Sequence, residues 1–185
     1  MLISLIVPCY NEEEAMPLFY QEAARVAAQM EKSHGAEFEI IFVDDGSKDG
    51  TLRVARELHD ADPRVRYVSF SRNFGKEAGI YAGLQAAKGD YVATLDADLQ
   101  DPPELIPEMI KHWEEGYDDV YAKRNVREGE TWFKIFTAKS FYWIMDRLTR
   151  SQLIAIPNNT GDFRLLDRRC IDSLKQMRES ERYTK

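Results

Sequence analysis

The chain has 185 residues, of which 44% are hydrophobic and 31% charged, and its mean hydropathy is −0.49. This length and composition predict one soluble globular domain and exclude a disordered chain. No run of eighteen apolar residues occurs, and Met1–Ile3 leads directly into an apolar segment, so neither a membrane-spanning helix nor a signal peptide is expected. The net charge of −7 at first argues against anionic partners.

That charge is divided unevenly along the chain. Residues 1–122 carry 24 acidic against 11 basic side chains, net −13, whereas residues 123–185 carry 8 against 14, net +6. A basic C-terminal region fits either a surface for an anionic partner or a solvated helix face. Charge alone favours the solvated face, so motifs must decide between the two.

Short continuous apolar runs alternate with helical patterns from residue 2 to about 122, which predicts an α/β fold with a parallel sheet covered by helices. Asn11 and Asp101, each followed three residues later by a glutamate, are predicted helix N-caps. The expected strands are Leu2–Val7, Phe38–Val43, Val65–Phe70, Tyr91–Leu95 and Val120–Ala122.

Four loops follow the first four expected strands. Ligands of open parallel sheets bind beyond the carboxyl ends of the strands, so these loops are expected to line one edge and to carry the function. The loops are Pro8–Glu13, Asp44–Gly50, Ser71–Lys76 and Asp96–Asp101.

The pattern changes after Ala122. A charged loop, Lys123–Glu130, precedes an expected aromatic helix, Thr131–Arg150, with interspersed basic residues. Such a helix fits an interfacial membrane helix and a core helix with snorkelling cations equally well. A short strand near Leu153–Ile156, a loop over Pro157–Asp162 and a final strand and helix are expected to follow.

Two aspartates directly after the run Tyr91–Leu95 have a spacing that suits a metal. Asp96 and Asp98 are predicted to project from the strand end, where carboxylate oxygens can hold Mg²⁺ or Mn²⁺ against a diphosphate. The spacing alone is a weak signal, because Asp60 and Asp62 repeat it at an expected helix end. Placement after a strand therefore favours Asp96 and Asp98.

Asp44 and Asp45 end the second expected strand in the same way. One of these carboxylates can accept hydrogen bonds from a nucleobase N–H or a ribose hydroxyl; the alternative is that they cap a helix beginning near Lys48. Capping accounts for one aspartate better than for two. Lys76 lies near a predicted helix start, where a cation suits a phosphate, although a lone lysine is more often a solvated surface residue.

Five sequence blocks occur in the order found in a known family. They are Pro8–Glu13, Val43–Thr51, Ser71–Glu77, Asp96–Pro103 and Gly161–Leu165. In these blocks the chain resembles the inverting family 2 glycosyltransferases, and within them the polyprenyl-phosphate sugar transferases of the dolichyl-phosphate mannose synthase and bactoprenol glucosyltransferase type. The resemblance covers nearly the whole chain, and five ordered blocks make it specific.

The resemblance implies a GT-A fold, with a mostly parallel Rossmann-like sheet flanked by helices, as a single catalytic domain over residues 1–185. Residues 1–122 would be its nucleotide-sugar-binding half and residues 123–185 its basic acceptor-side half. The implied donor is a UDP- or GDP-sugar, and the implied cofactor is Mg²⁺ or Mn²⁺. By analogy the metal is held by Asp96, Asp98 and Gln100, and the nucleotide sugar by Pro8, Tyr10, Glu12, Val43, Asp44, Asp45, Lys76, Asp96, Ala97 and Asp98.

The resemblance also implies inversion, in which a metal and basic side chains stabilise the departing nucleoside diphosphate. Asp98, Arg124, Arg127 and Asp162 are the implied catalytic residues, and Arg124, Arg127 and Arg164 would meet the acceptor phosphate. Asp162 is the candidate general base for a hydroxyl acceptor. A lipid phosphate needs no base, and Asp162 would then orient an arginine such as Arg164 or position the sugar.

These features leave two alternative sugar acceptors and two alternative functions that are not enzymatic transfer. The basic region and aromatic helix favour a polyprenyl phosphate lipid at a membrane surface, with the catalytic domain in the cytosol at the cytoplasmic face. Asp162 favours a saccharide or protein hydroxyl in the cytosol. A non-catalytic nucleotide-sugar-binding module is less favoured because the acidic residues are intact, and a phosphate-sensing receiver domain would leave about 60 residues unexplained. Nucleic acid is not an expected partner, and a homo-oligomer is compatible with the sequence.

The family's members usually continue into a further segment and transmembrane helices. The chain is therefore expected to be a catalytic domain truncated before its transmembrane part, within a basic element that includes Arg182 and Lys185.

Overall fold

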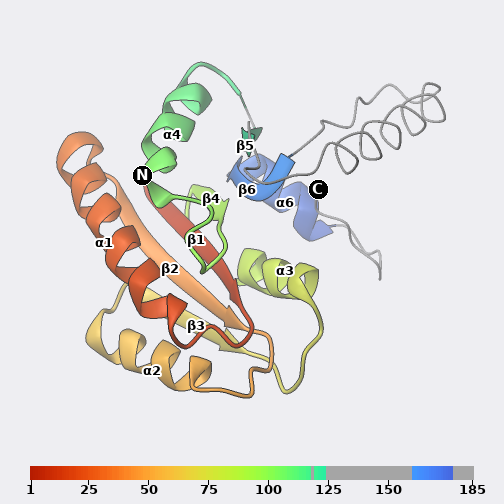
Figure 1. The fold of residues 1–185 in the computed structure, drawn as a ribbon. Helices are drawn as coiled ribbons and strands as arrows, with labels where there is room; N and C mark the ends of the chain where they lie inside the picture. Colours follow the sequence, from red (N-terminus) through yellow and green to blue (C-terminus); the bar gives the residue numbers. More distant parts are fainter. Residues whose placement is uncertain (118, 124–159, 177–185) are drawn as a thin grey trace, which may run out of the picture. The chain divides into compact units, whose positions relative to one another are not determined.

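The computed structural model describes residues 1–117, 119–123 and 160–176 (Figure 1). The chain divides into two compact units, one formed by Met1–Tyr121 with Asp162–Lys185 and the other by Ala122–Gly161. The expected helix Thr131–Arg150 and strand Leu153–Ile156 lie outside the described residues. The division into a donor half and an acceptor half stays a prediction.

The described strands form one mixed sheet in the order β3-β2-β1-β4-β6-β5. β1 pairs in parallel with β2 and β4, and β2 with β3, whereas β6 runs antiparallel to β4. The strands are β1 (Leu2–Cys9), β2 (Glu37–Asp44), β3 (Val65–Ser69), β4 (Tyr91–Thr94), β5 (Asp119–Lys123) and β6 (Thr160–Asp167). The predicted mostly parallel sheet is confirmed, and each expected strand from Leu2 to Ala122 is present.

The helices follow from the right-handed crossovers that parallel strands require. The chain moves outward from β1 to β3 through α1 and α2, then returns from β3 to β4 through α3, so α3 lies on the opposite face (Figure 1). The helices are α1 (Ala15–His34), α2 (Thr51–Ala61), α3 (Lys76–Ala86), α4 (Ile106–Glu114) and α6 (Arg168–Gln176), with a 3₁₀ turn, η1 (Pro103–Leu105). The strand order therefore reverses between β1 and β4, the position at which open sheets bind ligands.

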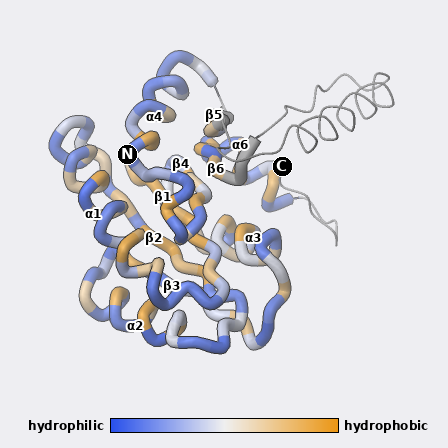
Figure 2. Tube along the Cα trace, in the orientation of Figure 1, coloured by the Kyte–Doolittle hydropathy of each residue, from blue (hydrophilic) through white to orange (hydrophobic). Residues whose placement is uncertain are grey.

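The core is built from apolar strands buried on both faces. Ile3, Leu5, Ile6 and Val7 of β1 are fully buried. Hydrophobic residues gather along β1 and β2, while α1 contains many hydrophilic residues (Figure 2). α3 packs closely on β1 at Gly83, which has no side chain. A Cβ added there would lie only 2.3 Å from the Ile6 Cγ2. This contact fixes α3 against the centre of the sheet.

Both predicted helix N-caps are wrong. α1 begins at Ala15 after Glu14, and Asn11 instead accepts a hydrogen bond from the Lys48 N–H across to the next loop at 2.9 Å. Asp101 is buried ahead of η1, whose N-cap is Pro102. The side chains that resembled caps contribute to the loops at the sheet edge, which a local pattern does not reveal.

The second aspartate pair, Asp60 and Asp62, lies at the end of α2 as expected, ahead of β3 and with no strand leading into it. Asp62 accepts hydrogen bonds from the Tyr20 hydroxyl at 2.8 Å and from the Arg64 guanidinium, with its Nη2 at 2.7 Å. The Arg64 hydrogen bonds lower the pKa of Asp62 to about 2, against the opposing effect of burial.

A depressed carboxyl pKa contributes stability above its unfolded value that is lost as the pH falls through the folded value. We expect Asp62→Asn to lower the free energy of unfolding by about 1 to 2 kcal/mol near neutral pH, allowing for screening of the half-exposed Arg64. The difference from the unmodified protein should shrink between about pH 4 and pH 2, measured by urea unfolding across that range. A difference that is constant with pH would contradict this role of the ion pair.

Candidate active site

Three of the four loops predicted to share one edge are joined there by side-chain hydrogen bonds. The Asn11 N–H donates to the Ser47 Oγ at 3.0 Å, and the Glu12 N–H donates to the Thr51 Oγ1 at 2.8 Å. Asn11 has a positive φ of 59°, which asparagine tolerates better than most residues. The loop after β1 is thereby fastened to the loop after β2, and Asp45 joins the latter to the loop after β3.

The buried carboxylate of Asp44 stabilises the turn at the end of β2 through two hydrogen bonds. Its side chain is buried, one oxygen accepts from the Ser47 N–H at 3.0 Å, and the other accepts from the Ser69 hydroxyl at 3.0 Å. Val43 beside it is fully buried in the core cluster. Any contact of Val43 with a bound nucleotide would therefore come from its backbone, and Asp44 holds the turn that follows it.

Asp45 holds the third loop. One oxygen accepts from the Phe74 N–H at 2.7 Å and the other from the Gly75 N–H at 2.8 Å. Neither Asp44 nor Asp45 caps α2, since the Thr51 N–H donates to Asp49 at 3.0 Å. The sequence suggested a ligand contact or a cap, and it gave no sign of these bonds to the third loop.

Lys76 and Asp96 join the third and fourth loops across the point where the strand order reverses. The Lys76 Nζ lies 2.5 Å from the Asp96 Oδ1, and both side chains are partly exposed. Lys76 is the first residue of α3, so the helix dipole and the ammonium group both favour an anion here. A diphosphate meets the same requirements as the carboxylate that Lys76 now contacts.

Asp98 is the more exposed member of its pair. Its Oδ1 accepts from the Gln100 N–H at 3.0 Å, and Leu99 between them has a positive φ of 60°. Ala97, on the other side of Asp98, is buried. The two carboxylates therefore differ: Asp96 contacts a cation of the protein, and Asp98 faces solvent.

Negative charge accumulates between the first and fourth loops. Burial, followed by the charges of Asp98 and Asp96, raises the pKa of Glu12. Burial, followed by the charge of Glu12, likewise raises the pKa of the Cys9 thiol. The smaller contribution of the neighbouring charges to both shifts reflects repulsion among the carboxylates, which a cation at this place would reduce.

The oxygen-only composition of this cluster fits Mg²⁺ or Mn²⁺. In the part of the chain that the structure describes, no three His, Cys, Asp or Glu residues are gathered closely enough to hold a metal by themselves. Mg²⁺ is commonly held by one or two carboxylates together with substrate phosphates, so the exposed Asp98 is a candidate ligand without two further protein carboxylates beside it. The Gln100 side chain stands in the same turn as a candidate ligand.

The predicted acceptor residues lie mostly beyond the described part of the chain. Arg124 and Arg127 are outside it, and of Asp162 only the backbone, in β6, is described. Arg164 pairs with Thr94 in the antiparallel β4–β6 register. The N-terminal half of β6, which contains Asp162, therefore lies at the same end of the sheet as Asp96.

Tyr10 and Phe74 also stand at this edge with large exposed side chains, 41% and 52% accessible. Tyr10 was expected from the sequence. Phe74 was not singled out, and Gly46, whose φ is +68°, was expected only as a turn residue after the two aspartates.

Comparison with known proteins places these features in a family. The model of Glycosyl transferase family 2 matches residues 4–175. An uncharacterised glycosyltransferase of Synechocystis is 45% identical over 183 residues, 99% of this chain and 55% of that protein. The prophage bactoprenol glucosyl transferase homologue of Escherichia coli is 42% identical over 185 residues, all of this chain and 58% of that protein. The chain thus spans little more than half the length of these curated relatives.

Solved structures share the fold at lower identity. A mannosyltransferase from Pyrobaculum calidifontis, in complex with GDP-Man and Mn²⁺, has a TM-score of 0.64 and 22% identity over 93% of this chain and 46% of its own. Glucosyl-3-phosphoglycerate synthase from Mycobacterium tuberculosis, in complex with UDP, has a TM-score of 0.61 and 20% identity over 91% of this chain and 57% of its own. They confirm the expected GT-A fold.

Proposed function

Because the chain belongs to glycosyl transferase family 2, we propose that it transfers a sugar from a nucleoside-diphosphate sugar, UDP- or GDP-linked, to a polyprenyl phosphate with inversion. The observation that carries the proposal is the Lys76–Asp96 pair beside the exposed Asp98, at the edge where the strand order reverses. There the protein offers an ammonium group, a helix N-terminus and a metal-ligating carboxylate to one diphosphate.

The donor would lie across the four loops. Its nucleoside would contact Pro8, Tyr10 and the backbone at Val43, while Glu12 would lie toward its ribose and phosphates. Lys76 would move from Asp96 to the diphosphate, and Asp98 with Gln100 would hold Mg²⁺ or Mn²⁺. When bound, the metal supplies Lewis-acid stabilisation of charge on the leaving diphosphate.

The reaction forms a bond from an acceptor oxygen to the anomeric carbon and breaks the bond from that carbon to the diphosphate. The nucleoside diphosphate leaves with the bonding electron pair, and the Lys76 ammonium stabilises the charge it gains. Arg124 and Arg127 would stabilise the negative charge of the departing diphosphate and would also contact the acceptor phosphate. Attack from the face opposite the leaving group inverts the configuration.

The acceptor follows from the relatives and the charge distribution. The similarity to bactoprenol glucosyl transferases and the net charge of +6 over residues 123–185 support an anionic lipid phosphate, met by Arg124, Arg127 and Arg164. A phosphate acceptor is already ionised and needs no general base. The alternative is a saccharide or protein hydroxyl, for which Asp162 would be the base.

We place the reaction at the cytoplasmic face of the membrane, where polyprenyl phosphate and soluble nucleotide sugars meet. Among the residues that the structure describes, no helix has the length and apolar character needed to span a bilayer.

The test is a transfer assay on the purified chain with Mn²⁺, a panel of UDP- and GDP-sugars, and either polyprenyl phosphate in detergent or free saccharides as acceptors. We expect one donor to give a glycosylated polyprenyl phosphate of inverted configuration, identified by mass spectrometry and NMR. Transfer to a saccharide alone would support the hydroxyl-acceptor alternative. Donor binding by calorimetry without transfer to either acceptor would support a binding module instead.

A further inference from the structure

Asn11 is bonded twice to the loop that follows β2. Its N–H donates to the Ser47 Oγ at 3.0 Å, and its Oδ1 accepts from the Lys48 N–H at 2.9 Å. Its φ of 59° lies in the left-handed region, which residues with a Cβ adopt rarely and asparagine more readily than most. Asn11 therefore combines a side-chain acceptor with a backbone conformation that few other residues accept.

The partner of the Asn11 N–H is itself fixed to the core. The Ser47 N–H donates to the Asp44 Oδ1 at 3.0 Å, and the other carboxylate oxygen of Asp44 accepts from the Ser69 hydroxyl at 3.0 Å. Asp44 is only 2% exposed. The hydrogen bonds thus connect the backbone of Asn11, through Ser47, to a buried side chain at the end of β2.

The two neighbours of Asn11 are residues that the proposed function places near the donor's nucleoside. The Tyr10 side chain is largely exposed, so its direction depends mainly on the backbone that carries it. Glu12 is partly buried, and its N–H donates to the hydroxyl of the buried Thr51 at 2.8 Å. A binding segment that is already ordered in the free protein loses less entropy when its ligand binds.

From this geometry we propose that Asn11 is a positioning residue for the nucleoside of the donor. Its left-handed backbone and its hydrogen bonds to Ser47 and Lys48 hold Tyr10 and Glu12 in the arrangement that the nucleoside meets. The inference rests on the proposed function in that Tyr10 and Glu12 contact the donor.

The test is calorimetry with UDP and GDP in the presence of Mn²⁺. For whichever binds, Asn11→Ala should weaken affinity about 10-fold, because Tyr10 and Glu12 must then be ordered on binding. Asn11→Ala combined with Tyr10→Ala should lose clearly less than the product of the two single losses, whereas the losses of Asn11→Ala and Lys76→Ala should multiply in full. Independent effects of Asn11→Ala and Tyr10→Ala, or an unchanged affinity in Asn11→Ala, would overturn the positioning role.

Ser47→Ala tests the same hydrogen bond without changing a residue next to Tyr10. It removes the acceptor of the Asn11 N–H, so it should weaken affinity and show the same coupling to Tyr10→Ala. Ser33→Ala is the matched control, because Ser33 is an exposed serine in the last turn of α1 whose hydroxyl donates to the Gln29 carbonyl at 3.0 Å. A Ser47→Ala protein that binds as tightly as Ser33→Ala would contradict the proposal.

Asn11→Gly separates the backbone conformation from the side-chain hydrogen bond. Glycine adopts the left-handed conformation without strain but offers no acceptor to the Lys48 N–H. It should therefore recover part of the affinity that Asn11→Ala loses. A glycine variant that binds no better than the alanine variant would exclude the left-handed conformation from the role.

Hydrogen exchange gives a readout that does not depend on any nucleotide. The Lys48 amide should lose protection in Asn11→Ala and keep it in Ser33→Ala; unchanged protection in Asn11→Ala would refute the hydrogen bond on which the positioning depends. If the unmodified protein binds neither UDP nor GDP, the proposed function fails. If it binds one of them and Asn11→Ala binds it equally well, only the positioning role fails.

Discussion

Asp98→Ala is expected to abolish the gain in donor affinity that a divalent metal provides. Asp98 is the exposed carboxylate of the fourth loop, and Asp96 beside it contacts the Lys76 ammonium. Removing Asp98 leaves Asp96 of this pair, which is only partly exposed and contacts the Lys76 ammonium, to meet a metal bound to the diphosphate. Since a metal supplies several kcal/mol of charge stabilisation, we expect the affinity measured with Mn²⁺ to fall by about 100-fold.

The measurement is titration calorimetry of the nucleoside diphosphate with and without Mn²⁺. In the unmodified protein Mn²⁺ should tighten binding, and in Asp98→Ala the two affinities should coincide. Asp60→Ala is the matched control, because Asp60 has the same Asp-Ala-Asp context at the exposed end of α2. An Asp98→Ala protein that still binds more tightly with Mn²⁺ would remove Asp98 from the metal site.

The sheet could be predicted because its signal is local. Apolar runs such as Phe38–Val43 are long enough to be recognised one at a time, and the crossover rule then places their carboxyl ends at one edge. The structure puts strand ends at Cys9, Asp44 and Thr94, within two residues of the expected positions. The candidate loops could thus be named before their geometry was known.

What the sequence could not supply is which polar side chains engage one another across the loops. Asn11 matches the pattern of a helix cap, yet it bonds to Lys48, 37 residues away. Asp45 matches a ligand contact or a cap, and the sequence does not indicate that its oxygens also accept from the Phe74 and Gly75 N–H groups. A hydrogen bond between distant residues leaves no periodicity in the sequence, and a short polar side chain suits several roles equally.

The position and direction of β6 in the sheet could not be predicted from the sequence either. A final strand was expected, but nothing in Thr160–Asp167 indicates that it runs antiparallel between β4 and β5. Strand order depends on pairing between segments far apart in the chain. This placement brings the backbone of Asp162 to the end of the sheet where the donor loops lie.

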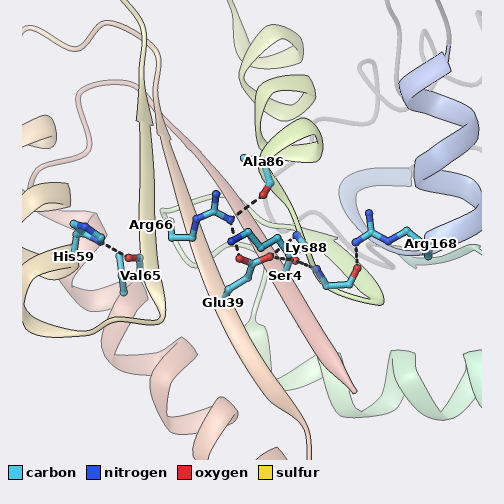
Figure 3. Close-up of polar contacts among 9 residues, drawn as sticks. Ser4, Glu39, His59, Val65, Arg66, Ala86, Lys88 and Arg168 are labelled. Atoms are coloured by element: carbon cyan, nitrogen blue, oxygen red, sulfur yellow. Dashed lines mark hydrogen bonds and ion pairs between the residues drawn. The ribbon is translucent and has the colours of Figure 1, made fainter.

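A buried polar network on the α3 side of the sheet carries the largest expected effect on stability. Glu39 of β2 is 9% exposed and accepts from the Ser4 hydroxyl at 2.6 Å, the Lys88 N–H at 2.6 Å and the Arg66 Nη1 at 2.9 Å (Figure 3). Arg66 also donates to the Ala86 carbonyl at 2.8 Å. Glu39 thereby ties three strands to the end of α3.

The ionised form of Glu39 is the one that these contacts stabilise. Burial alone would raise its pKa, but the hydrogen bonds from Ser4, Lys88 and Arg66 outweigh burial and hold the pKa below its ordinary value. A depressed carboxyl pKa contributes stability above about pH 4.5, which is lost as the pH falls through the folded value.

We expect Glu39→Ala to lower the free energy of unfolding by about 3 to 5 kcal/mol, because it leaves the Arg66 charge and two other donors without their acceptor. Glu39→Gln keeps an acceptor oxygen and should cost about 1 to 2 kcal/mol, so it remains measurable if the alanine variant does not fold. The measurement is urea unfolding near neutral pH and at decreasing pH below about 4.5, over which the difference between Glu39→Gln and the unmodified protein should narrow as Glu39 becomes protonated.

Glu37→Ala is the matched control, since Glu37 lies two residues earlier on the same strand with an exposed side chain. Its replacement should change stability by less than about 0.5 kcal/mol. A Glu39→Ala protein no less stable than Glu37→Ala would mean that water replaces the carboxylate at no cost. The three strands and α3 would then be held together by their apolar contacts alone.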